Sequence, residues 1–111
     1  FRLNFRFDVQ LPRHANLSAL SPQDRFLWQQ FSGFLKAHEL QHTQLWLRCG
    51  TSLERQVMAI RASSCAEVER KAEAIWRRMK PNCDREQVNF DKGQRSVLVA
   101  QPFMQKVIRG E

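Results

Sequence analysis

The sequence predicts an α+β fold in which a small sheet packs on two helices. Three observations support this prediction. Residues 1–11 alternate between apolar and polar side chains, residues 21–60 follow the period of an amphipathic helix, and residues 96–104 contain a short apolar run typical of a second strand. With 111 residues, the chain is long enough for one hydrophobic core and too short for two, so we expect residues 1–111 to form a single domain.

The N-terminal residues are predicted to form a half-buried strand. Every second side chain is apolar, which places on one face Phe1, Leu3, Phe5, Phe7, Val9 and Leu11. One face of such a strand lies on a core while the other meets water. A strand at the edge of a sheet could also pair with an extended peptide. Residues 12–20 are expected to form a loop.

A long helix is expected to follow this loop. Ser21 is a good N-cap residue and Pro22 suits the first helical turn, so the helix should begin there. Its apolar period extends at least to Cys49. Gly50 either ends the helix or is a weak point within it, and we favour continuation to Ile60.

The C-terminal half is predicted to contain a second helix and an extended segment. Ser64 and Glu67 have the spacing of a capping box, which marks a helix start. Pro81 should stop or kink this helix, although one or two further turns could follow it. Residues 92–93 are expected to form a turn, and residues 96–104 a strand or extended tail.

The most informative motif is H-E-x-x-H, formed by His38, Glu39 and His42 inside the long helix. Two histidines four residues apart project from the same face, so both can bind one zinc ion, with the glutamate beside it as a general base. Both belong to the predicted buried face, which comprises Leu27, Phe31, Phe34, Leu35, His38, His42, Leu45, Trp46 and Cys49. The alternative is that both are core histidines bonded to neighbouring polar groups.

Composition narrows the possible functions. Hydrophobic content of 42% indicates a globular chain, and no apolar run approaches the ~20 residues that span a bilayer. No signal peptide is visible in this stretch. The formal net charge is +7, but the basic residues are scattered. A solvated surface therefore explains them better than binding to nucleic acid or an anionic surface.

The three cysteines leave at least one without a partner inside the chain. If residues 65–80 form one helix, Cys65 and Cys83 lie more than ~20 Å apart. A disulfide would then have to involve Cys49 or require a bent second helix. The cysteine count alone does not identify the redox compartment.

The chain resembles a bacterial family of predicted secreted zinc-dependent proteases that is otherwise uncharacterised. The resemblance covers nearly the whole chain and rests on Leu11-Pro12 after the first strand, Trp28 in the helix that leads to His38-Glu39-x-x-His42, the segment Ser64-Cys65-Ala66-Glu67, and the pair Phe90-Asp91. It implies a zincin-like fold, a Zn²⁺ cofactor, a peptide or protein substrate, and a secreted or periplasmic location. It also implies that His38 and His42 are metal ligands and that Glu39 is the catalytic base.

The segment that would supply the third metal ligand departs from the family pattern. Family members follow the aromatic-Asp pair with Thr-x-His-Gly, whereas Asp91 is followed here by Lys92 and Gly93, and no histidine lies after His42. Asp91 is the favoured substitute because it lies nearest in sequence to the expected ligand. The other candidates are His14, Cys83, Asp84 and Glu86.

Three functions follow. The first is a zinc-dependent metallopeptidase that hydrolyses peptide bonds with a metal-activated water and Glu39 as general base. The second is a degenerate, weak or inactive family member that acts as a binding module, which the missing histidine would explain. The third is a basic domain that binds an anionic partner through salt-sensitive contacts.

Overall fold

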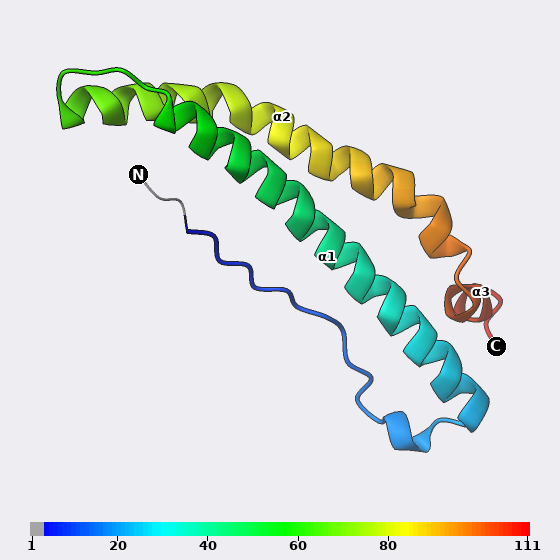
Figure 1. The fold of residues 1–111 in the computed structure, drawn as a ribbon. Helices are drawn as coiled ribbons and strands as arrows, with labels where there is room; N and C mark the ends of the chain where they lie inside the picture. Colours follow the sequence, from blue (N-terminus) through cyan, green and yellow to red (C-terminus); the bar gives the residue numbers. More distant parts are fainter. Residues whose placement is uncertain (1–3) are drawn as a thin grey trace. The chain divides into compact units, whose positions relative to one another are not determined.

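The computed structural model describes residues 4–111, and within that range it is helical without any strand (Figure 1). A short 3₁₀ helix, η1 (Leu17–Ala19), precedes two long helices, α1 (Pro22–Met58) and α2 (Cys65–Val99), and a short final helix, α3 (Pro102–Ile108). The α+β, zincin-like prediction is therefore wrong.

The N-terminal strand fails because no second strand is available to it among residues 4–111. Residues 1–3 lie outside the described part of the chain. The alternation of apolar residues remains, but Phe5 lies against a helix. A Cβ atom on Gly50 would overlap the Phe5 ring, so this close approach requires glycine. In residues 4–11, Phe5 thus contacts α1, whereas Phe7, Val9 and Leu11 are exposed and pack on no sheet.

The C-terminal strand is wrong for a different reason. Residues 96–99 belong to the last turn of α2, and Pro102 occupies the start of α3, where its missing N–H costs nothing. A short apolar run cannot distinguish a strand from a buried helical turn. The turn expected at residues 92–93 is also absent, since both residues lie inside α2.

Both helix starts are confirmed. The Asp24 N–H donates to Ser21 Oγ at 3.1 Å before α1, and the Glu67 N–H donates to Ser64 Oγ at 3.2 Å before α2. Each serine satisfies a backbone donor that has no partner within the helix. The favoured continuation of the first helix through Gly50 is also confirmed, although α1 ends at Met58 and not at residue 60.

The described chain divides into two compact units, residues 4–7 with 42–89 and residues 8–41 with 90–111. Both α1 and α2 contribute to each unit. In the first, residues 59–64 reverse the chain so that α2 runs back along α1 (Figure 1), and Gln56 near the end of α1 contacts Arg78 and Met79 of α2. A disulfide joins Cys49 to Cys83, and both residues are buried, as is Val57.

The helix α2 contains Pro81, two residues before the disulfide cysteine Cys83. A proline inside a helix removes one backbone hydrogen bond and costs about 3 kcal/mol. Here α2 continues to Val99, and the residue two positions after the proline is covalently bound to α1. Pro81 was expected to stop or kink the helix, and the stop is wrong, because α2 continues for 18 residues after it.

The second unit is built around an aromatic cluster. The ring of Phe103 from α3 lies 5.3 Å from Trp28 and 5.1 Å from Phe31, both on α1. Phe31 is buried. Lys106 of α3 forms an ion pair with Asp24 in the first turn of α1. The short helix α3 is thus held to α1 by stacked rings and one charge pair.

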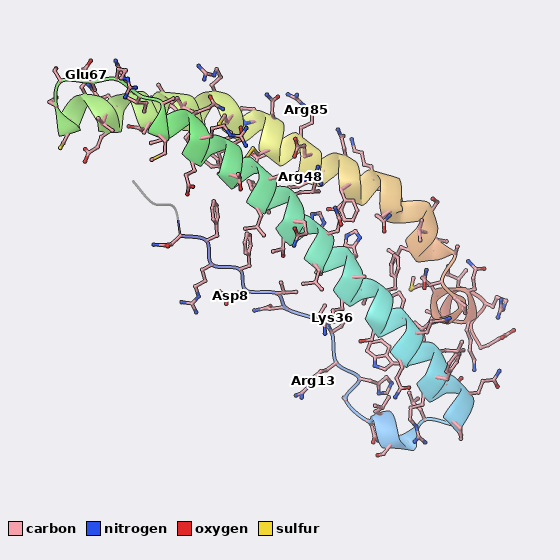
Figure 2. The ribbon with its side chains drawn as sticks, in the orientation of Figure 1. Asp8, Arg13, Lys36, Arg48, Glu67 and Arg85 are labelled. Atoms are coloured by element: carbon pink, nitrogen blue, oxygen red, sulfur yellow. A yellow bond between two sulfur atoms is a disulfide. The ribbon has the colours of Figure 1, made fainter. Side chains whose placement is uncertain are left out.

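Many charged side chains of α2 are occupied on its own surface. Lys71, Arg77 and Lys80 pair with Glu67, Glu73 and Asp84 respectively, each four residues away. Arg85 projects from α2 away from α1 (Figure 2), and donates to Asn82. These contacts fit the solvated surface expected from the sequence. None of the helices in residues 4–111 is both long and apolar enough to cross a membrane.

Candidate metal centre

The face of α1 that carries the H-E-x-x-H motif points inward, as predicted. Every residue of that predicted face is buried or half-buried, from Leu27 to Cys49. His38 and His42 are both half-buried, and they lie one turn apart on a continuous helix. Residues with this spacing share a helix face. The helix therefore presents both imidazoles on the same side.

His38 is held by residues of α2 within its own unit. Its Nε2 atom lies 2.9 Å from Asp91 Oδ1, and the Phe90 ring stacks on the imidazole with centroids 4.7 Å apart. The His38 side chain is 15% exposed and that of Asp91 is 59% exposed, so the carboxylate forms the solvent side of the pair. Asp91 was the favoured third ligand, and this contact brings it to one of the two predicted histidines.

His42 is oriented by a different residue of α2. Its Nδ1 atom lies 2.6 Å from Gln87 Oε1, within the other unit. An amide oxygen only accepts hydrogen bonds, so this contact suits the tautomer with the proton on Nδ1, which has its lone pair on Nε2. Histidines that bind metals commonly have this arrangement, because a partner on the second nitrogen fixes the ring and its tautomer.

Glu39 borders a cavity next to His38. The cavity has a volume of about 330 Å³, and its lining includes Glu39, His38 and Asp91. Leu35 and Leu98 form part of its apolar wall. The predicted base and two potential ligands therefore face one recess within a single unit.

The remaining candidates for a third ligand lie away from the motif. The Asn16 N–H donates to His14 Nδ1, and the His14 ring lies edge-on to Trp28 at 5.7 Å. Cys83 is in the disulfide, and Asp84 pairs with Lys80. Glu86 borders a separate cavity of about 440 Å³ beside the disulfide, which contains no residue of the motif.

Sequence reasoning missed Gln87 and Phe90 as supporting residues. The available signal was spacing on α2, because Gln87 and Asp91 lie four residues apart and so share a helix face. The expected turn at residues 92–93 hid this relationship. Once α2 is known to be continuous, these positions face α1.

Comparison with known proteins identifies the family. A family model described as "Bacterial protein of unknown function (DUF922)" matches residues 1–96. The chain belongs to this family. Membership in DUF922 confirms the bacterial, uncharacterised family that the resemblance implied, while its description specifies no metal, activity or secretion. No curated protein and no solved structure matches the chain.

Proposed function

We propose that this DUF922 protein is a zinc-dependent peptidase in which His38 and His42 bind the metal and Asp91 serves as third ligand. The observation that carries the proposal is the 2.9 Å contact between His38 Nε2 and Asp91 Oδ1. It supports Asp91 as the substitute for the histidine that the C-terminal part lacks. The proposal depends on these residues and not on a zincin-like fold.

The donor chemistry suits zinc. Two imidazoles and one carboxylate form a common ligand set for catalytic zinc, which leaves a fourth position for water or substrate. The hydrogen bond from His42 to Gln87 supports the role of His42, because it directs the lone pair to Nε2. Zinc, when bound, acts as a Lewis acid that activates water and polarises a carbonyl group.

Glu39 supplies the proton transfers. It follows His38 directly on α1 and lines the same cavity, which places a carboxylate beside the ligands. In peptide hydrolysis it accepts a proton from the attacking water and delivers it to the leaving amine. Neither transfer requires Glu39 to bind the metal.

Replacing this base tests the reaction. Zinc-loaded protein is incubated with a mixture of peptides, and the products are identified by mass spectrometry. Glu39→Gln should retain zinc and lose roughly 10²- to 10⁴-fold in rate, the usual contribution of a general base. Glu73→Gln, which alters an exposed glutamate paired with Arg77, is the matched control. Full activity of Glu39→Gln would refute the mechanism.

A binding module is the second candidate function. The stacking of Phe90 on His38 and the contact with Asp91 are also what a structural histidine would make. On this alternative, the motif helps to pack α1 against α2 within its unit and peptides bind without cleavage. Peptide turnover by protein that holds stoichiometric zinc would exclude it.

We also propose a secreted or periplasmic location. The Cys49–Cys83 disulfide supports it, because such bonds persist mainly in oxidising compartments. The natural full-length protein, expressed in its bacterium and fractionated under thiol-blocking conditions, should be found outside the cytoplasm with this bond formed. Recovery in the cytoplasm with all three cysteines reduced would contradict this proposal.

A further inference from the structure

The cavity beside Glu39 has features that the hydrolytic proposal does not use. Arg95 lies on α2 one turn after Asp91 and lines the same cavity. Among residues 4–111, no hydrogen bond or ion pair engages Arg95. An unengaged guanidinium at the wall of a recess is suited to bind a carboxylate through two parallel hydrogen bonds.

Apart from Arg95 and the residues of the proposed catalytic site, the rest of the cavity lining is apolar except for Gln94. Phe34 and Leu35 contribute from α1, and Leu98 contributes from α2. The volume of about 330 Å³ lies at the lower end of the range for ligand pockets, which suits one residue and not a long peptide segment. The recess thus combines apolar side chains, a cationic group and the three residues His38, Glu39 and Asp91.

The spacing along α2 fits the end of a peptide. Arg95 is four residues after Asp91, which corresponds to about 6 Å along a helix axis. In an extended peptide, a terminal carboxylate lies about 3.5 Å beyond the preceding carbonyl carbon. When the scissile carbonyl lies near Asp91, the terminal carboxylate therefore lies about 2.5 Å short of the level of Arg95 along the helix. The long arginine side chain can reach across this distance.

We propose that Arg95 binds the C-terminal carboxylate of a peptide whose last side chain occupies the apolar wall, so that the protein removes apolar C-terminal residues one at a time. This inference rests on the proposed peptidase function. Water adds across the last peptide bond, whose C–N bond breaks; the carbonyl carbon becomes the carboxylate of the shortened peptide, and the proton accepted by Glu39 passes to the amine of the released amino acid.

A binding measurement tests the carboxylate site without any turnover. Metal-free protein labelled with ¹⁵N is titrated with N-acetyl-Ala-Leu and with its C-terminal amide, and shifts are followed at residues around the cavity. The acid should bind roughly ten- to a hundredfold more tightly than the amide, and Arg95→Gln should abolish the difference. Lys92→Gln, which removes a neighbouring charge of α2 that does not line the cavity, should preserve it.

Turnover then separates this inference from the peptidase proposal. Zinc-loaded protein should cleave the acid and spare the amide, and Arg95→Gln should raise KM for the acid more than it lowers kcat. Equal cleavage of acid and amide, unchanged in Arg95→Gln, would overturn the inference while leaving the peptidase standing. Preferential binding of the acid without any cleavage would instead refute the peptidase, and equal binding of acid and amide would refute the carboxylate site.

Discussion

His38 Nε2 and Asp91 Oδ1 lie 2.9 Å apart, although 53 residues separate them in the sequence. The distance fits a hydrogen bond, and it also brings together two atom types that commonly bind zinc. The same contact can therefore hold two helices of one unit together and provide part of a ligand set. This dual capacity leads to the first prediction.

Asp91→Asn should weaken zinc binding far more than it weakens the fold. The amide preserves a hydrogen-bonding group for His38 but is a much poorer zinc ligand than a carboxylate. We expect zinc affinity to fall by at least roughly a hundredfold, given that even indirect supporting residues contribute ten- to a hundredfold. Competition with a zinc-sensitive dye measures this. Asp84→Asn, which alters a surface pair with Lys80, is the control and should bind zinc normally. Equal affinity in Asp91→Asn and the parent would exclude Asp91 as a ligand.

The disulfide should contribute substantially to stability. Cys49 and Cys83 are 34 residues apart, and closing a loop of that length restricts the unfolded chain by about 3–4 kcal/mol in the chain-entropy treatment. Replacing both with serine should lower the free energy of unfolding in urea by a similar amount. Cys65→Ser changes the exposed free cysteine and should leave stability unaltered. An equal loss of stability in the Cys49/Cys83 double variant and in Cys65→Ser would contradict the Cys49–Cys83 pairing.

Two glycines of α1 should respond oppositely to alanine. An added Cβ at Gly33 meets nothing within 4 Å, so Gly33→Ala should stabilise the helix by about 1 kcal/mol. At Gly50 the Cβ would collide with the Phe5 ring, and Gly50→Ala should therefore destabilise the protein. Thermal unfolding measures both. Combining Gly50→Ala with Phe5→Ala should remove the penalty, and a penalty that persists would mean that Phe5 does not pack there.

The ion pair of Asp24 should make stability depend on pH in the acidic range. The hydrogen bond from Lys106 holds the pKa of the Asp24 carboxyl below its ordinary value. Because the folded-state pKa is lowered, the pair stabilises the fold above the unfolded pKa of about 4 and loses this effect as pH falls through the folded-state pKa. Urea midpoints of the parent and Asp24→Asn should therefore differ at neutral pH and converge below about pH 4. A difference that stays constant down to the acid limit would rule out this role for Asp24.

The sequence predicted local features of the helices better than the fold class. The serine caps and the buried face of α1 follow from nearby residues, so the sequence pattern was sufficient for them. A strand requires a partner from elsewhere in the chain, and alternation at residues 4–11 carries no information about whether one exists. Pro81 is a second example. The local sequence favours a helix end there, whereas α2 continues and is joined to α1 by the disulfide at Cys83, a contact distant in sequence.

Some residues of the candidate site could be predicted from the sequence, and others could not. His38, Glu39 and His42 are recognisable from spacing alone, since one helix fixes their arrangement. Asp91 could be favoured from its place in the sequence, but its contact with His38 depends on how α2 packs against α1 in that unit. Gln87 and Arg95 have no motif, and they become visible only when α2 is known to run through residues 92–93.

The proposed function requires that His38 and His42 bind zinc, which the zinc content of the purified protein measures. Protein purified without a metal-affinity tag is equilibrated with zinc, dialysed and analysed by elemental analysis beside His38→Ala and His14→Ala. We expect about one zinc per chain in the parent and in His14→Ala, and almost none in His38→Ala. No zinc in the parent, or equal zinc in the parent and His38→Ala, would contradict the claim and leave the motif as part of the packing of α1.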